Sequence, residues 1–214
     1  MEKKITITQD SLKLNGSLNL IKSSIGLVIF AHGSGSSRFS PRNILVAKKL
    51  QEKNISTLLF DLLTKEEEKI DEITLEHRFN INMLAKRLIE VTSWIEKQKD
   101  LKDLKLGYFG ASTGSSAALI AAAFEKEKIK AVVSRGGRPD LAMKYLKDVK
   151  AATLLIVGGL DIEVIEMNEK AFKELKCTKE LKIVEGATHL FEEENKLEEV
   201  ALIAATWFKK HFKK

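Results

Sequence analysis

Residues 107–123 read GYFGASTGSSAALIAAA, so an apolar run passes through a Gly-x-Ser-x-Gly pattern into an alanine-rich helical run. Ser112 is held between Gly110 and Gly114 in this pattern. Glycines there let the backbones of a strand and a helix approach where a Cβ atom would clash, and the sharp turn lifts the serine hydroxyl clear of both. The stretch predicts a strand, a tight turn and a helix, with Ser112 as a candidate nucleophile. A glycine-rich helix start with a structural serine is the alternative.

The alternation of short apolar runs and helical patterns continues on both sides of this stretch. The apolar runs are rich in Val, Ile and Leu, as in strands covered on both faces. They read IGLVIFAHG, ISTLLFDLL, LKLGYFG, IKAVVSRGG, ATLLIVGGL and LKIVEGATH. Helical patterns cover residues 41–53, 74–99, 113–125, 139–146, 164–175 and 196–212. Such an order predicts an α/β protein with a mostly parallel sheet and helices on both faces.

Two other segments have different patterns. KKITITQ and LKLNGSLNL near the N-terminus alternate apolar and polar residues, which predicts an antiparallel hairpin at one edge of the sheet. TKEEEKIDEIT, residues 64–74, is rich in charge and is interpreted as a solvated loop after the fourth strand. Because no long linker or internal repeat is visible, we expect residues 1–214 to form a single domain.

Composition excludes several classes of protein. The 214 residues are 44% apolar and 31% charged, and no apolar run approaches the roughly 20 residues that cross a bilayer. The first residues, MEKKITITQD, show no secretory signal. The one cysteine, Cys177, cannot form an internal disulfide and fits a reducing compartment. We therefore expect a cytoplasmic protein without a metal site.

The formal net charge of +6 does not by itself indicate a nucleic-acid partner. Lysines and glutamates alternate through most of the chain instead of segregating. The basic end, WFKKHFKK, fits a solvated last helical turn, where cations lie at the negative end of the helix dipole.

A serine hydroxyl is a poor nucleophile until a base removes its proton, and an acid must orient that base. Ligands of such sheets bind at the carboxyl ends of the strands. Of the four histidines, His189 follows the last predicted strand and is the candidate base. His77 falls within a predicted helix and His211 in the exposed tail, while His32 is expected to shape the loop after the third strand.

The orienting acid is expected after the strand that precedes His189. Asp161 follows the seventh predicted strand, which gives the chain order Ser112, Asp161, His189. Glu163 is the reserve acid, and Asp61 after the fourth strand is a weaker one.

Acyl transfer also needs donors directed at the developing oxyanion. The backbone N–H of Thr113, directly after the candidate nucleophile, is one. Ser34 in the loop HGSGSS is the second. That loop lacks the lysine of a P-loop and the third glycine of a dinucleotide fingerprint, which disfavours phosphate binding.

Three arginines are candidates for substrate binding. Arg135 and Arg138 follow the sixth strand in SRGGRPD, and Arg38 lies in the loop after the third. Their guanidinium groups suit a carboxylate or phosphate on the substrate. An ordinary ion pair, for example with Asp140, is the alternative.

Five motifs together resemble the α/β-hydrolase fold, and within it the dienelactone hydrolase-like family: HGSGSSR, GASTG, SRGGRPDLA, LLIVGGLD and GATHLFEE. The resemblance spans the chain from about residue 5 and implies an eight-stranded sheet and a hydrolase that needs no cofactor. Dienelactone hydrolases proper use a cysteine at the turn, whereas this chain has Ser112. The resemblance therefore implies a serine hydrolase of the same build, like those found alone or fused to phosphoribosyltransferase domains.

We expect cleavage of a small ester, thioester or related acyl bond through an acyl-enzyme. The alternatives are a non-catalytic binding or regulatory module of the same fold, and an acyltransferase or perhydrolase that uses the same nucleophile. The expected partner is a small-molecule acyl substrate, without nucleic acid or membrane, and a homodimer is compatible with the sequence. Because the chain runs from Ser134 through two glycines to Pro139, it leaves no room for a large helical lid, which favours short acyl groups.

Overall fold

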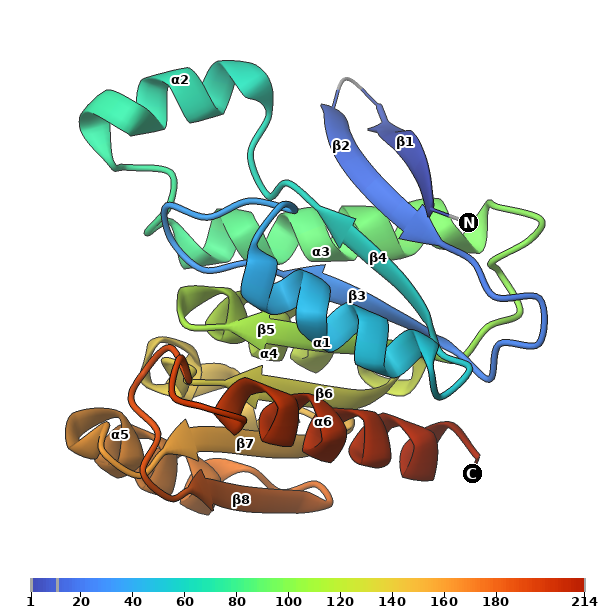
Figure 1. The fold of residues 1–214 in the computed structure, drawn as a ribbon. Helices are drawn as coiled ribbons and strands as arrows, with labels where there is room; N and C mark the ends of the chain where they lie inside the picture. Colours follow the sequence, from blue (N-terminus) through green and yellow to red (C-terminus); the bar gives the residue numbers. More distant parts are fainter. Residues whose placement is uncertain (1, 11, 214) are drawn as a thin grey trace.

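Eight strands form one sheet in the computed structural model, which describes residues 2–10 and 12–213. They are β1 (Glu2–Gln9), β2 (Leu12–Asn19), β3 (Leu27–Ala31), β4 (Ser56–Phe60), β5 (Leu106–Ala111), β6 (Ile129–Arg135), β7 (Ala152–Gly158) and β8 (Lys179–Val184). Their order is β1-β2-β4-β3-β5-β6-β7-β8 (Figure 1). β1 and β2 form the predicted antiparallel hairpin at one edge, β2 pairs antiparallel with β4, and the remaining pairs are parallel.

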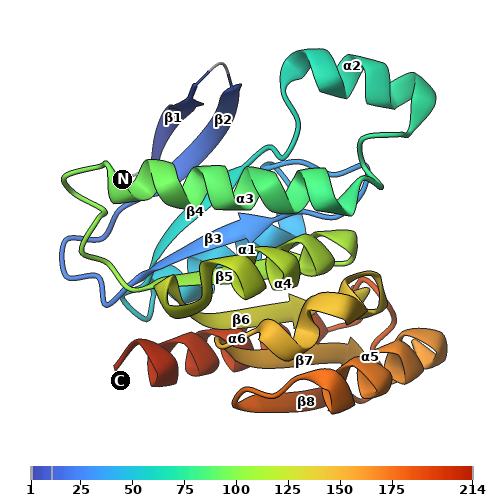
Figure 2. The ribbon, with the colours of Figure 1, turned by 180° about the vertical axis from the view of Figure 1, so that it is seen from behind.

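Helices cover both faces of this sheet. α1 (Pro41–Gln51) and α6 (Lys196–Phe212) lie on the face shown in Figure 1. α3 (Ile81–Glu96), α4 (Thr113–Glu125), α5 (Ile162–Glu174) and the 3-10 helix η2 (Pro139–Asp148) lie on the other, shown in Figure 2; η1 (Lys126–Lys128) is a short 3-10 turn. The predicted α/β class, with a mostly parallel eight-stranded sheet, is confirmed.

Successive side chains of the central strands enter two different apolar layers. In β5, Tyr108 packs in the cluster against α3 and α4, whereas Phe109 packs in the cluster against α1 and α6. Both side chains are fully buried. Burial on both faces explains why these strands read as continuous apolar runs in the sequence.

The prediction of a solvated loop over residues 64–74 is wrong, because Lys65–Thr74 form a helix, α2. Thr64 and Glu67 form a capping box: the Thr64 hydroxyl accepts the N–H of Glu67, and the Glu67 carboxylate accepts the N–H of Thr64. This pair satisfies two N–H groups that have no partner inside the helix. In Figures 1 and 2, α2 stands away from the sheet above β4.

The helix predicted over residues 74–99 starts later than expected, at Ile81, where the side chain of Asn80 caps α3. His77 therefore lies in the connection between α2 and α3 and not within a helix. Asp71 accepts hydrogen bonds from the backbone N–H groups of His77 and Arg78, which holds this connection as a turn.

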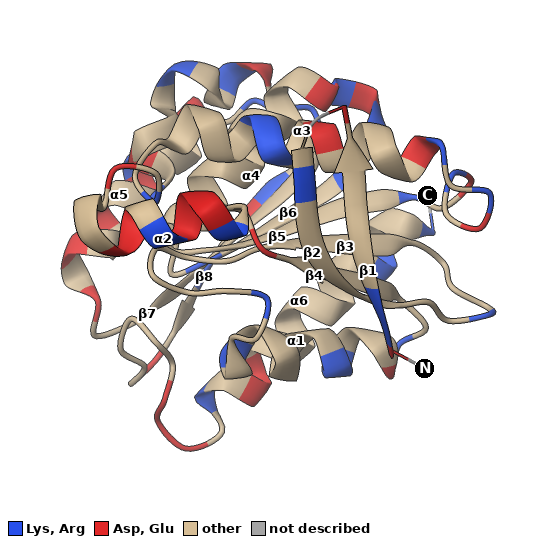
Figure 3. Ribbon diagram, turned by 90° about the horizontal axis from the view of Figure 1, so that it is seen from above, with Lys and Arg blue, Asp and Glu red and all other residues tan. Residues whose placement is uncertain are grey.

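The basic end of the chain forms the predicted last turn of a helix, with lysines exposed, but the expectation that His211 lies in an exposed tail is wrong. His211 is buried, with its ring 4.4 Å from that of Trp207, while Lys209 and Lys210 are exposed. Charges of both signs are spread over the ribbon, and α2 carries a marked acidic stretch (Figure 3). Within the described residues, no helix is both long and apolar enough to cross a membrane.

Candidate active site

The turn after β5 holds Ser112 in a backbone conformation that is unusual for serine. Its φ is 50° and its ψ is −123°. Gly110 and Gly114 are required because other backbone atoms lie too close for a side chain. A Cβ atom on Gly110 would lie 2.3 Å from Cα of Ser115. One on Gly114 would lie 2.3 Å from the carbonyl oxygen of His32. The strand, turn and helix predicted from the Gly-x-Ser-x-Gly pattern are therefore present, with the strain expected at a functional turn.

A short segment after β6 links this turn to the loop that carries His189. The N–H of Ser112 donates to the carbonyl oxygen of Arg135 at 3.1 Å. The next residue, Gly136, has a φ of 51°, and a Cβ atom there would lie 3.5 Å from Cε1 of His189. The carboxyl ends of β5, β6 and β8 thus bring Ser112 and His189 to the same edge of the sheet.

His189 and Asp161 form a short hydrogen bond. Nδ1 of His189 lies 2.6 Å from Oδ2 of Asp161, and Asp161 comes from the end of β7. An imidazole that donates from Nδ1 to a carboxylate leaves Nε2 free to accept a proton. The structure therefore joins the predicted base and the predicted acid.

The two reserve acids lie elsewhere. Glu163 is exposed in the first turn of α5 and has no hydrogen bond to His189. Asp61 pairs with Arg38, accepting hydrogen bonds from its backbone N–H and its guanidinium group. These contacts favour Asp161 as the acid.

His32 has the loop-shaping role expected of it. Its Nδ1 lies 3.0 Å from the carbonyl oxygen of Gly33, and Nε2 accepts the N–H of Leu62 at 3.1 Å. Burial lowers the pKa of His32, against smaller opposing effects of the Gly33 carbonyl and Asp61. The neutral imidazole ties the loop after β3 to the end of β4.

The two predicted oxyanion donors are neighbours. The N–H of Ser34 donates to Oγ1 of Thr113 at 3.0 Å, and the two hydroxyls lie 2.8 Å apart. Thr113 is the first residue of α4, where a backbone N–H has no partner within the helix. The Thr113 N–H is therefore available to a ligand, whereas the Ser34 N–H is engaged by the Thr113 side chain.

The three predicted substrate-binding arginines differ in their contacts. Arg38 is paired with Asp61, and Arg138 makes two hydrogen bonds to Asp140, at 2.9 and 2.8 Å. Arg135 is only 6% exposed, and its Nε and Nη1 find no hydrogen-bond partner among the described residues. Burial, together with the charge of Arg42, lowers the pKa of Arg135 to about 10.

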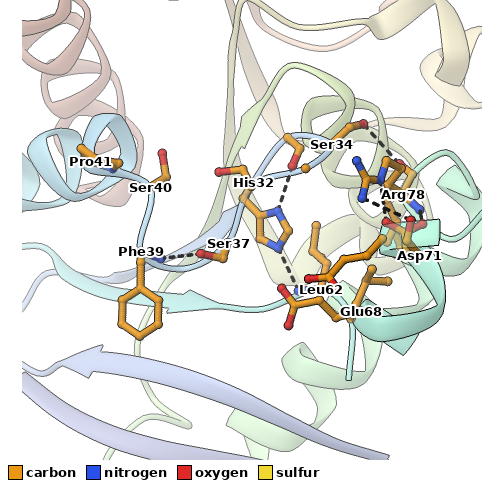
Figure 4. A pocket seen from close by; sticks show the side chains of 16 residues that line it. His32, Ser34, Ser37, Phe39, Ser40, Pro41, Leu62, Glu68, Asp71 and Arg78 are labelled. Carbon is orange, nitrogen blue, oxygen red and sulfur yellow. Dashed lines mark hydrogen bonds and ion pairs between the residues drawn. The ribbon is translucent and has the colours of Figure 1, made fainter. Parts of the chain in front are cut away.

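A cavity of about 370 Å³ beside the loop after β3 was not foreseen from the sequence. It is lined by that loop, by the end of β4 and by residues of α2 and of the connection to α3, including Asp71 and Arg78 (Figure 4). The Thr64-x-x-Glu67 capping signal would have revealed α2, and hence a wall over this edge of the sheet. Among the described residues, no three His, Cys, Asp or Glu side chains gather as a metal site.

Comparison with known proteins identifies the family of this chain. The model of the dienelactone hydrolase family matches residues 26–212. The chain belongs to the dienelactone hydrolase family. A dienelactone hydrolase from Anabaena variabilis ATCC 29413 has 52% sequence identity and a TM-score of 0.97, over 99% of this chain and 98% of that one.

More distant structures share the fold of this dienelactone hydrolase family member. Est1E from Butyrivibrio proteoclasticus has a TM-score of 0.82 and 18% identity, over 99% of both chains. Family and fold together support hydrolase activity.

Two curated relatives are longer than this chain. Each is named "Putative phosphoribosyl transferase", comes from a strain of Mycobacterium tuberculosis and is 49% identical over 210 residues. The match covers 98% of this chain and 46% of the relative, so the chain spans about half their length.

Proposed function

We propose that this protein is a serine hydrolase that cleaves a small ester, thioester or related acyl bond through an acyl-enzyme on Ser112. The observation that carries the proposal is the 2.6 Å contact between His189 and Asp161, at the edge of the sheet where the strained turn presents Ser112. Family membership supports the reaction class.

In the proposed reaction, Nε2 of His189 takes the proton of the Ser112 hydroxyl as the oxygen attacks the acyl carbon. Asp161 accepts the Nδ1 hydrogen bond and stabilises the imidazolium that forms. The imidazolium then gives the proton to the leaving oxygen or sulfur. Water attacks the acyl-enzyme with His189 again as the base, which releases the acid and restores Ser112.

The negative charge that develops on the acyl oxygen would be stabilised at the start of α4. The N–H of Thr113 and the positive end of the helix dipole both favour an anion there. The N–H of Ser34 is the second proposed donor, and it would turn from Oγ1 of Thr113 to the oxyanion.

Arg135 is proposed to bind an anionic group of the substrate. A buried guanidinium without a counterion is unfavourable, and a carboxylate or phosphate would compensate it. Arg38 and Arg138 are less suited to this role, because Asp61 and Asp140 already occupy them.

We infer that phosphoribosyl transfer, if the M. tuberculosis relatives perform it, belongs to the part of those proteins that this chain does not match. The relatives match 98% of this chain, and the dienelactone hydrolase family model covers residues 26–212 of it. We also propose a cytoplasmic location, with which the single Cys177 is consistent.

Reaction with a fluorophosphonate probe tests the proposal. The probe should label the wild-type protein at Ser112, identified by peptide mass spectrometry, and should not label Ser112→Ala. A second variant, Ser116→Ala, controls for labelling of a neighbouring helix serine. Labelling that persists in Ser112→Ala would show that the nucleophile lies elsewhere, and a wild type that neither reacts nor hydrolyses esters would favour the non-catalytic module.

A further inference from the structure

The cavity of about 370 Å³ begins at the proposed catalytic serine's own neighbours. Gly33 and Ser34 form its near wall, and a Cβ atom on Gly33 would lie 3.2 Å from Cβ of Ser112. Its floor includes the apolar side chains of Leu62, Leu63 and Leu84. Figure 4 shows His32 between the Ser34 loop and Leu62, with Asp71 and Arg78 on the α2 side.

The cavity and His189 lie on opposite sides of Ser112 along the sheet. The cavity is built on the ends of β3 and β4, whereas His189 and Asp161 follow β8 and β7. In the strand order β4-β3-β5-β6-β7-β8, Ser112 at the end of β5 separates the two groups. A substrate held at Ser112 can therefore extend one part toward His189 and another into the cavity.

The proton transfer from His189 determines on which side of Ser112 the leaving group and the acyl group lie. The leaving group must receive its proton from His189, so it lies on the side of β7 and β8. The acyl group extends from the same carbon in the other direction. Resting on the function proposed above, we propose that the cavity under α2 is the acyl-binding pocket and that α2 selects compact, non-anionic acyl groups.

Two ion pairs hold α2 as the roof of this pocket. Asp71, buried at the end of α2, accepts 2.8 and 2.9 Å hydrogen bonds from the N–H groups of His77 and Arg78 and a 2.6 Å bond from Nε of Arg78. Burial alone would raise the pKa of Asp71, but the bonds from Arg78 and His77 outweigh it and lower the pKa. At the other end of the helix, Glu67 pairs with Arg87 of α3.

The size and charge of the pocket define the acyl group it accepts. A volume of about 370 Å³ lies at the lower end of the range of ligand pockets. Glu68 and Glu72 line the pocket from α2, and in the part of the chain that the structure describes neither has an ion-pair partner. Their charges would repel a carboxylate on the acyl group, so an anionic group bound by Arg135 must belong to the leaving group.

Two pocket variants test the assignment. Each is compared with a control variant whose substitutions lie on the same helix or on the connection after it. Glu68→Trp fills the pocket, and Glu66→Trp adds the same side chain at an exposed position that does not line it. Glu68→Gln/Glu72→Gln removes two lining charges, and Glu66→Gln/Glu76→Gln removes two charges that do not line it. Circular dichroism and thermal unfolding establish that each variant is folded.

The readout is kcat/KM in two series of esters. In the first, p-nitrophenol is the constant leaving group and the acyl group is acetate, pentanoate or the mono-anion of glutarate, corrected for spontaneous hydrolysis. In the second, acetate is the constant acyl group and the leaving group is p-nitrophenol or 4-methylumbelliferone.

Glu68→Trp should lower the pentanoate-to-acetate ratio at least tenfold, while Glu66→Trp leaves it unchanged. Glu68→Gln/Glu72→Gln should raise the glutarate-to-pentanoate ratio about threefold to tenfold, as expected for charges a few ångströms apart near water. This gain should shrink at high salt. The leaving-group ratio should stay constant in all variants.

The assignment is overturned if the pocket variants match their controls in the acyl series. It is also overturned if they change the leaving-group ratio instead, which would make the cavity a leaving-group pocket. Failure of the underlying function looks different, because the wild type would then show neither fluorophosphonate labelling nor turnover dependent on Ser112.

Discussion

Ser112 combines a strained backbone with a position where three strand ends meet. A positive φ costs a residue with a Cβ atom of the order of 1–3 kcal/mol, and here φ is 50°. The surroundings hold the turn in place: the carbonyl of Ser112 accepts the N–H groups of Ser115 and Arg138, and its N–H donates to Arg135. These hydrogen bonds hold the strained backbone of Ser112 in place, and the proposed function of the turn is to present the Ser112 hydroxyl to the substrate.

Substitutions of the triad should separate chemistry from stability. Ser112→Ala or His189→Ala should lower kcat by about four to six orders of magnitude, and Asp161→Asn by about three to four, because the residues act as a unit. Melting temperatures should change little. Steady-state kinetics with a p-nitrophenyl ester measures the effect, and Glu163→Gln is the control. If Glu163→Gln loses kcat and Asp161→Asn keeps it, Glu163 and not Asp161 is the acid.

Arg135 should lower the free energy of unfolding of the protein and, at the same time, contribute to substrate binding. Its pKa is lowered on folding, so at any pH below about 10 the charged form opposes folding. Arg135→Met should therefore raise the free energy of unfolding by about 1–3 kcal/mol at neutral pH. The same variant should lose kcat/KM for esters with an anionic leaving group and keep it for neutral ones of matched size.

Arg138→Met is the matched control for this change, since Arg138 is paired with Asp140 and partly exposed. Urea unfolding and kinetics on the two esters measure both effects. Equal kcat/KM for anionic and neutral esters in wild type and Arg135→Met would remove the anion-binding role.

At the scale of elements, α2 differs from the other helices because hydrogen bonds and ion pairs near its two ends hold it, including the pair of Glu67 with Arg87 of α3. The capping box at Thr64 starts it, and the Asp71–Arg78 pair fixes its end. Its two apolar residues, Ile70 and Ile73, are 47% and 85% exposed. Tertiary packing, which stabilises most helices, contributes less here.

Loss of the cap should therefore loosen α2 without unfolding the protein. Thr64→Ala should destabilise the helix by about 0.5–2 kcal/mol, since one helix N–H loses its acceptor. Hydrogen exchange of residues 65–74 should accelerate, while exchange in β5 and β6 stays slow. Thr74→Ala, at the exposed other end, serves as control. Faster exchange throughout the sheet would show that α2 is part of the cooperative core.

At the scale of the whole molecule, the layers leave only a small space for an acyl chain. After β6 the chain passes through the 3-10 helix η2 to β7 and inserts no helical lid. Near Ser112, residues of α2 line one side of a cavity of about 370 Å³. A long acyl chain would leave methylenes in water, each forgoing about 0.8 kcal/mol.

Chain-length dependence tests this consequence of the architecture. Among p-nitrophenyl esters from acetate to palmitate, kcat/KM should peak below eight carbons. A detergent-free series with substrates below their critical micelle concentration keeps aggregation from distorting the profile. A peak at eight carbons or beyond would require an acyl pocket larger than the one beneath α2.

The sequence by itself determined the layered α/β fold and the order Ser112, Asp161, His189. These are readable because buried strands give continuous apolar runs, and because glycine is required where the backbones of β5 and α4 meet. Parallel strands end at one edge, so residues after successive strands could be expected together without knowing any distance. The resemblance to the dienelactone hydrolase family added the expectation of a hydrolase that needs no cofactor.

Tertiary structure alone decided which of the three arginines lacks an acidic partner and where the cavity lies. Arg38 pairs with Asp61 and Arg138 with Asp140, whereas Arg135 has no acidic partner among the described residues. Residues 64–74 read as a charged loop, because α2 contains few apolar residues and buries none of them, and because its fixed end depends on Arg78 in the next connection. The Arg38–Asp61 pair and the walls of the cavity join segments that are distant along the chain, so the sequence around each residue does not reveal them. The Arg138–Asp140 pair is local, and the sequence already offered it as the alternative to substrate binding.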